Sequence, residues 1–224
     1  MKITFLGQAG LLFQTADCSI MIDPYLSDSV VKINPLNYRR VPVDTRFFDV
    51  CPDILIFTHD HLDHFDPETV EILLQKHKGI TVLAPSSVWN KVRQMAPGNN
   101  YVLFDRFTRW THGGIRFEAV KAQHSDAFAI GVIITLEGKK YYITGDTLYS
   151  TEVLGDLPDD LDAVFLPVNG VGNNMNMVDA ADFFRATGAK IAVPLHTGMF
   201  DELSGADFPV ENKAVPEIYK EIKL

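Results

Sequence analysis

The segment Thr58-His59-Asp60-His61-Leu62-Asp63-His64 constrains this chain more than any other feature. It places three of the seven histidines within six residues. It directly follows the apolar run 53–58, which predicts a short strand buried on both faces. A loop at the end of such a strand can turn several side chains toward one point. Imidazole and carboxylate groups are the usual ligands of Zn²⁺ and related ions, so the segment indicates a metal site more than a solvated polar loop.

Three further candidate ligands lie far along the chain, each just after a predicted strand. Sheet-based sites gather residues from distant parts of a sequence at the ends of strands. We therefore expect these residues to join the histidine-rich segment at one edge of a sheet. They are His124 after Phe117–Val120, Asp146 in the string TGDT after Tyr141–Thr144, and His196 after Ile191–Pro194.

Length and composition indicate a globular chain and limit the kinds of molecule that it can bind. A chain of 224 residues with 46% hydrophobic residues suits one globular domain over 1–224. The 20 Lys and Arg against 29 Asp and Glu give a net charge of −9, which disfavours nucleic acid and anionic membranes and leaves a small-molecule substrate as the expected partner. The charge does not decide the oligomeric state, so a homo-oligomer stays open.

The cysteines and the hydropathy pattern indicate where such a chain works. Cys18 and Cys51 cannot form a disulfide framework, which favours a reducing compartment, by default the cytoplasm. The most apolar stretch, Ala127–Leu136, is about half the ~20 residues that a bilayer crossing needs. We expect no transmembrane helix, and we interpret the N-terminus as mature structure.

Strands dominate the expected secondary structure, with helices between them, which predicts an α/β (α+β) fold. Ser27–Val50 has no clear period and is expected to be a long loop. Asp66 followed by Pro67 predicts the capped start of a helix that runs to about Lys78. The other expected helices are Ser86–Met95, capped by serine, and Met177–Ala186, and the other expected strands lie in Lys2–Ile22, Thr81–Ala84, Tyr101–Phe104, Arg106–Trp110, Ile115–Val120, Ala129–Leu136, Lys140–Thr144 and Ala163–Leu166.

The order H-x-H-x-D-H, then His, then Asp in GDT, then His resembles the ligand series of the metallo-β-lactamase-fold hydrolases, over nearly the whole chain. The resemblance implies a four-layer αββα sandwich with a dinuclear metal centre. It also implies that Asp23 and Thr58 hold ligand side chains in place. By the same resemblance, His59, His61 and His124 bind one ion, Asp63, His64 and His196 bind the second, and Asp146 bridges both.

This ligand set predicts a hydrolase. Two divalent cations, Zn²⁺ by default or Mn²⁺, would lower the pKa of a bridging water and supply a hydroxide near neutral pH. Asp63 and Asp146 are the expected catalytic carboxylates, with Asp63 also orienting the attacking water.

A finer resemblance concerns the strings 166–176 and 194–200, which look most like the L-ascorbate-6-phosphate lactonase group. It implies a lactone or other ester as substrate, with a sugar-acid phosphate as one specific case. Asparagines in turns and exposed arginines are also common without any function. The candidate substrate-binding residues are Asn169, Asn173, Asn174, Tyr149, Arg39 and Arg40.

Two alternatives stay open. The same ligand set serves a phosphodiesterase, including a nuclease of the RNase Z kind, although the acidic charge weighs against RNA. The chain could instead be a non-catalytic metal-binding sensor or assembly protein, although a complete ligand set weighs against that.

Overall fold

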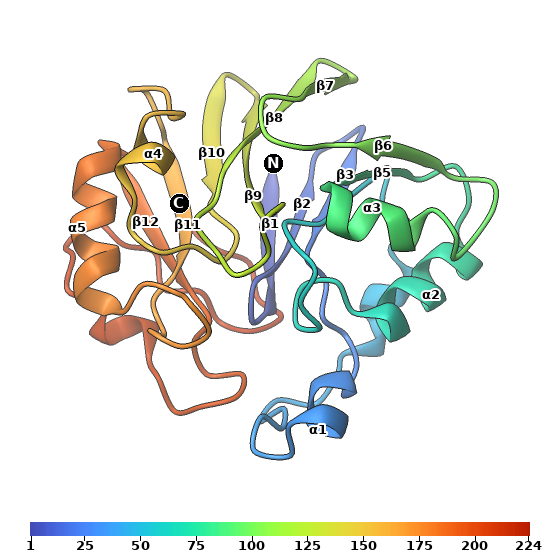
Figure 1. Cartoon of the computed structure of the whole chain (residues 1–224), viewed down its shortest axis with the longest axis horizontal. Helices are drawn as coiled ribbons and strands as arrows, with labels where there is room; N and C mark the ends of the chain where they lie inside the picture. Colours follow the sequence, from blue (N-terminus) through green and yellow to red (C-terminus); the bar gives the residue numbers. More distant parts are fainter.

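The computed structural model describes all 224 residues and shows two six-stranded sheets, one from each half of the chain (Figure 1). The N-terminal sheet has the strand order β1-β2-β3-β4-β5-β6, and the C-terminal sheet the order β12-β11-β10-β9-β8-β7. The N-terminal strands are β1 (Lys2–Gly7), β2 (Gly10–Gln14), β3 (Ser19–Ile22), β4 (Ile54–Ile56), β5 (Thr81–Ala84) and β6 (Asn100–Leu103). The C-terminal strands are β7 (Arg109–His112), β8 (Ile115–Lys121), β9 (Ile130–Leu136), β10 (Lys139–Ile143), β11 (Ala163–Pro167) and β12 (Ile191–Leu195).

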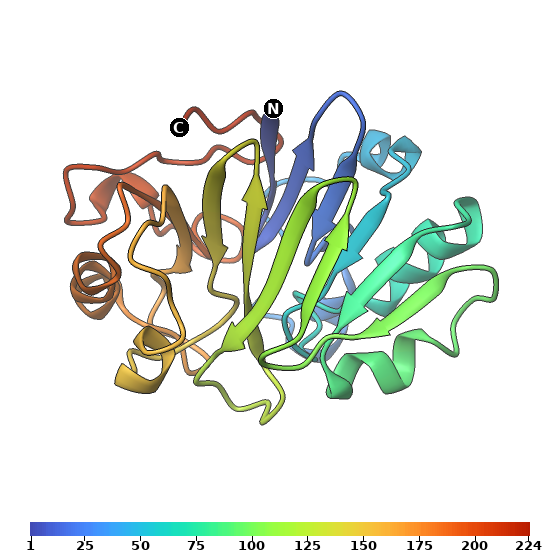
Figure 2. The ribbon, with the colours of Figure 1, turned by 90° about the horizontal axis from the view of Figure 1, so that it is seen from above.

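Helices cover the outer faces of the two sheets (Figures 1 and 2). The helices α2 (Pro67–Lys76) and α3 (Ser86–Val92) flank the N-terminal sheet, and α5 (Met177–Thr187) flanks the C-terminal sheet. The short helices α1 (Ser29–Ile33) and α4 (Thr151–Leu154) lie in connections. The layers therefore follow the order helix, sheet, sheet, helix, which confirms the αββα sandwich.

Each sheet changes from antiparallel to parallel pairing. In the N-terminal sheet β1, β2 and β3 pair antiparallel and β3 to β6 pair parallel. In the C-terminal sheet β7 to β10 pair antiparallel, and β10, β11 and β12 pair parallel. Parallel strands end at the same edge, so the loops that follow them gather there.

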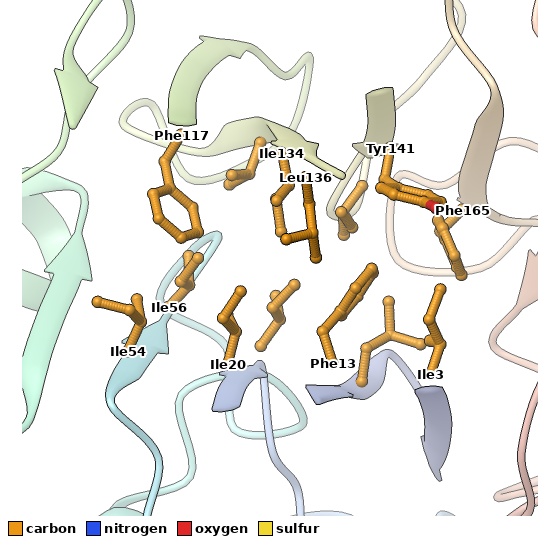
Figure 3. Close-up of a cluster of buried hydrophobic side chains, with 14 of the residues drawn as sticks. Ile3, Phe13, Ile20, Ile54, Ile56, Phe117, Ile134, Leu136, Tyr141 and Phe165 are labelled. Atoms are coloured by element: carbon orange, nitrogen blue, oxygen red, sulfur yellow. The ribbon is translucent and has the colours of Figure 1, made fainter. Parts of the chain in front are cut away.

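The main core lies between the two sheets, where alternate side chains of each strand point inward (Figure 3). Ile20 and Ile54 face Phe117 and Ile134 across this space. Phe13 of β2 packs edge-on against Tyr141 of β10, with ring centroids 5.7 Å apart. Each such fully buried aliphatic or aromatic side chain stabilises the fold by about 1.5–3 kcal/mol, and the contacts fix the two sheets against each other.

Capping residues mark the start of α2 and the end of α5. Asp66 accepts hydrogen bonds from the backbone N–H groups of Glu68 and Thr69, with Pro67 in the first turn, as expected. This helix ends at Lys76, two residues before the expected end. Gly188 ends α5 with φ +66°, a left-handed conformation that glycine adopts without strain.

Several expectations on local structure were wrong. The segment 27–50 is not a plain loop, because it contains α1 and the 3₁₀ turn Thr45–Asp49. Ser86 does not cap α3; its hydroxyl donates to Asp105 Oδ2 at 2.6 Å, so a tertiary contact takes the side chain that a local cap would use. That helix also ends at Val92 rather than Met95.

The expected strand Arg106–Trp110 begins only at Arg109. Phe107 has φ +73°, outside the extended region, and the Arg106 side chain pairs with Asp156. None of the helices is both long and apolar enough to cross a bilayer.

Candidate metal centre

The seven side chains named as candidate ligands come together in two adjacent groups. Potential ligand atoms of His59, His61, His124 and Asp146 lie within 4.8 Å of one another, as do those of Asp63, His64 and His196. In each group some members follow β4 of the N-terminal sheet and the rest follow strands of the C-terminal sheet. The centre therefore spans the two sheets. Beside it, the backbone N–H of Ile130 donates a hydrogen bond to Thr58 O at 3.0 Å and so joins the two sheets.

In the first group, three imidazole nitrogens surround one point. His61 Nδ1 lies 3.1 Å from His59 Nε2 and 3.2 Å from His124 Nε2. Nitrogens about 2.0–2.1 Å from a tetrahedral zinc ion would be about 3.3–3.4 Å apart. The observed separations are close to that spacing, so the three rings fit around one ion.

Two histidines of the second group direct buried nitrogen atoms toward Asp146 of the first group. Its Oδ1 lies 2.8 Å from His196 Nε2 and 3.1 Å from His64 Nε2. All three atoms are buried, yet none has a hydrogen bond of acceptable geometry. Leaving such an atom without a partner costs about 1–3 kcal/mol, so atoms aimed at a common point fit a cation between them.

Asp23 and Thr58 hold two of the histidines in orientation. Asp23 Oδ1 accepts from the backbone N–H of Thr58 at 2.9 Å, and its Oδ2 lies 2.8 Å from His64 Nδ1. The Thr58 hydroxyl donates to Asp23 Oδ2 at 2.5 Å and lies 3.1 Å from His59 Nδ1. These contacts engage the Nδ1 atoms and leave both Nε2 atoms for the centre.

A glycine allows the two sheets to approach at this point. Gly145, between β10 and Asp146, has φ +60°, and a Cβ there would lie 2.8 Å from Ile130 O and 2.9 Å from Thr58 Cβ. Any larger residue would push against the threonine that orients the histidines. The expected string TGDT therefore carries a steric requirement beside its aspartate.

The charges of the centre show why it needs a cation. Burial alone would raise the pKa of Asp146, but the neighbouring His196 and His64 imidazoles hold it well below its usual range. Burial would lower the pKa of His64, but Asp146 and Asp23 outweigh burial and raise it well above its usual range. Buried carboxylates thus draw positive charge into the site, which a proton on His64 or a metal ion supplies.

His59 and His124 favour the neutral form, which is the form that binds a metal ion. Burial, reinforced by the His64 imidazole, lowers the pKa of His59 well below its usual range. Burial also lowers the pKa of His124, against an opposing effect of Asp146. A neutral imidazole has the free lone pair that a metal ion requires.

Gln8 belongs to the site, although the sequence did not indicate it. It is buried, its Nε2 donates to Asp63 Oδ2 at 2.7 Å, and the same Nε2 lies 2.8 Å from His196 Nδ1. Gln8, Asp23 and His196 all have positive φ, of +54°, +44° and +58°. Such strain in non-glycine residues is concentrated at functional sites. No local pattern around Gln8 could have identified it, because its partners lie far away in the sequence.

A cavity of about 330 Å³ opens over the centre, because His61, Asp63, Asp146 and His196 line it. Val30 of α1 also lines it, and α1 lies at one end of the molecule (Figure 1). Asn169 and Asn174 line it, and Asn174 Nδ2 donates to Asp146 Oδ2 at 2.8 Å. A larger hollow of about 510 Å³, beside Phe107 and Leu157, touches none of the candidate ligands. The smaller cavity is therefore the one that can present a substrate to the centre.

The remaining expected substrate-binding residues do not line this cavity. Arg39 donates to Tyr25 O at 2.8 Å and to the Tyr219 hydroxyl at 2.6 Å, and Arg40 pairs with Glu202 at 3.1 Å. Tyr149 packs edge-on against Phe183. The backbone oxygen of Asn173 lies 3.3 Å from His124 Nδ1. The guanidinium groups of both arginines thus contact other groups of the chain outside this cavity.

Known proteins are similar to this chain in sequence and in fold. A model of the β-lactamase superfamily domain matches residues 19–197. A protein called UPF0173 metal-dependent hydrolase from Ligilactobacillus salivarius is 32% identical over 242 aligned positions, covering 100% of both chains. One of the same name from Listeria monocytogenes is 31% identical and covers 89% of this chain and 86% of its own length.

Solved structures agree on the architecture. The isothiocyanate hydrolase from Delia radicum gut bacteria superposes with a TM-score of 0.78 at 20% identity, covering 100% of this chain and 99% of its own. With its His and Asp cluster and these relatives, the chain belongs to the metal-dependent hydrolases of the metallo-β-lactamase superfamily.

Proposed function

We propose that this protein hydrolyses a lactone or another ester at a centre of two divalent metal ions, zinc by default and manganese as the alternative. His59, His61 and His124 would hold one ion and Asp63, His64 and His196 the other, with Asp146 available to both. The observation that supports this most is the position of Asp146, which belongs to the first group and has Oδ1 within 3.1 Å of two histidines of the second.

The ions would activate water near neutral pH and polarise the ester carbonyl when bound. Asp63 lines the cavity, and its side chain is 22% exposed, whereas the Asp146 side chain is 6% exposed. Asp63 is therefore the carboxylate that can orient the attacking water and receive its proton. Asp146 is fixed by Asn174 and keeps its charge inside the centre.

The size of the cavity favours a small substrate. Its volume lies at the lower end of the range for small-molecule sites, about 300–1,000 Å³. A polynucleotide needs a basic surface along its backbone, and this chain has a net charge of −9. These features favour an ester over the phosphodiester alternative. The free thiols of Cys18 and Cys51 agree with action in the reducing cytoplasm.

The test combines metal analysis with a substrate panel. The purified chain, loaded with zinc or with manganese, is assayed on lactones, a thioester, bis(p-nitrophenyl) phosphate and an isothiocyanate, the last because one structural neighbour hydrolyses that group. We expect about two ions per chain and the highest kcat/KM on lactones. Hydrolysis confined to the phosphodiester would replace the ester proposal with a phosphodiesterase. Fully metallated protein that turns over nothing would favour a metal-binding sensor.

A further inference from the structure

The lining of the cavity carries negative and neutral polar groups but no lysine or arginine. Besides the carboxylates Asp63 and Asp146 of the centre, it includes the carboxylate of Asp201. The side-chain amides of Gln8, Asn37, Asn169 and Asn174 supply the remaining polar surface apart from the histidines. Val30, Val171 and Phe200 form its apolar part. A substrate whose body carries a negative charge would find no cationic side chain there.

The cations nearest in sequence to this lining are paired with other groups. The Lys32 ammonium lies 2.5 Å from Glu68, and Arg40 pairs with Glu202. Arg39 lies over the ring of Tyr25, which packs edge-on against Phe200 behind the cavity wall. Arg39 could turn toward a ligand only by losing its hydrogen bonds to Tyr25 O and the Tyr219 hydroxyl and its cation–π contact, whereas the exposed pairs of Lys32 and Arg40 contribute little stability.

Asp201 is fixed at the cavity by the backbone. Its Oδ1 lies 2.9 Å from Leu203 N and 3.3 Å from Gly198 N, from which it accepts hydrogen bonds. Moving the carboxylate away from an entering anion would break both hydrogen bonds. With ions bound, the charges of Asp63 and Asp146 would be compensated, so Asp201 is the lining carboxylate that stays uncompensated. An anionic substituent beside it would be repelled.

We propose that the cavity selects small uncharged substrates and discriminates against those that carry a phosphate, sulfate or carboxylate group away from the reacting carbonyl. The inference rests on the proposed ester hydrolysis and makes it more specific. It separates this chain from a lactonase for sugar-acid phosphates, which would need a cationic side chain for its phosphate group.

The experiment compares one lactone with and without a phosphate group. Metal-loaded protein is given L-gulono-1,4-lactone or its 6-phosphate, and both kcat/KM and the calorimetric Kd are measured. We expect the neutral lactone to be preferred at least tenfold. Val171→Lys places a cation at the cavity rim on a residue that is 67% exposed, and should reduce the preference at least fivefold.

Val178→Lys is the matched control. Val178 is 65% exposed, lies on α5 and does not line the cavity, so it makes the same change of charge elsewhere. We expect its preference to equal that of the wild type. Asp201→Asn keeps an oxygen to accept from Leu203 N but removes the charge, and should reduce the preference about threefold.

The outcomes separate the two proposals. Tight binding of the neutral lactone without turnover would contradict ester hydrolysis and leave the charge selection standing. A kcat/KM of the wild type for the lactone 6-phosphate that equals or exceeds its kcat/KM for the neutral lactone would overturn the charge selection, even if both lactones are hydrolysed. Charge selection is also overturned if the neutral lactone does not bind, or if Val178→Lys changes the preference as much as Val171→Lys.

Discussion

Gln8 and His196 are 188 positions apart in the sequence and are joined twice at the centre: His196 N donates to Gln8 O at 2.9 Å, and Gln8 Nε2 lies 2.8 Å from His196 Nδ1. Both residues have positive φ. The two contacts between them stabilise both strained backbone conformations. The Gln8 amide also donates to Asp63. One uncharged side chain therefore orients two of the three residues in the second group.

Replacing this amide should weaken metal binding in the second group alone. Gln8→Met keeps the length of the side chain but removes both polar contacts, and groups that orient ligands typically contribute 10–100-fold to metal affinity. We expect one ion per chain to be bound 10–100-fold more weakly, as measured by competition with a chelating dye. Gln14→Met, on the next strand, serves as the control and should bind metal as the wild type does. Unchanged affinities in Gln8→Met would contradict the role of this residue.

Asp63 should be required for turnover but not for folding. Asp63→Ala removes a candidate ligand of the second group and the more exposed of the two proposed catalytic carboxylates, so we expect kcat to fall at least 10²-fold. Asp60→Ala is the control within the same motif, because Asp60 pairs with Lys91 and belongs to neither group. Steady-state kinetics and circular dichroism measure the two effects. A folded Asp63→Ala protein that keeps most of its kcat would refute the assignment.

Gly145→Ala should destabilise the protein through a steric clash. The new methyl group would approach Ile130 O and Thr58 at under 3 Å, in a backbone conformation that alanine rarely adopts. Gly138→Ala, with φ +76° and no atom within 4 Å, carries the same conformational cost without the clash. Strain of this backbone kind costs about 1–3 kcal/mol. We expect Gly145→Ala to lower the unfolding free energy more than Gly138→Ala does, and to lower the metal affinity as well. Denaturant titrations with and without metal measure both effects.

Acid should weaken the fold through the Arg106–Asp156 pair. Asp156 Oδ1 and Oδ2 each lie 2.8 Å from a guanidinium nitrogen of Arg106, and this contact lowers the pKa of Asp156 below its ordinary value of 3.8. Because the folded state binds this proton less readily than the unfolded state, the pair stabilises the protein above about pH 4 and its contribution is lost as the pH falls below that value.

Asp156→Asn tests this pH dependence. It should cost about 1.5–3 kcal/mol of unfolding free energy at pH 7, and the difference from the wild type should shrink as the pH falls below about 4. Asp160→Asn is the control, because its partner Lys140 lies at the surface and such exposed pairs contribute little. A difference that does not depend on pH would mean that packing, and not charge, is what Asp156 contributes.

The strands and their order along the chain could be predicted because local chemistry decides them. Continuous apolar runs such as Ile54–Ile56 form buried strands, and Asp66 with Pro67 begins a helix in almost any context. The candidate ligands were also visible, because histidines and aspartates follow strands of predictable length. Their assignment to two ions came from a family resemblance and stays a prediction.

The missed features depend on tertiary contacts. The short helix α1 has no apolar period of its own, and Ser86 is drawn to Asp105 rather than to its helix. Gln8 sits in an apolar segment that predicts only a strand and a turn. Arg39 looked available for a ligand because nothing in its neighbourhood in the sequence reveals Tyr219, which binds it 180 positions later.

Because both groups of candidate ligands draw on both sheets, neither half of the chain can assemble the centre alone. During synthesis the N-terminal sheet emerges first with His59, His61, Asp63 and His64, and it must wait for His196, close to the end of the chain, before the second group is complete. Stable metal binding should thus be the last step of folding. The bound ion should then stabilise the arrangement in which the two halves are docked in the correct register.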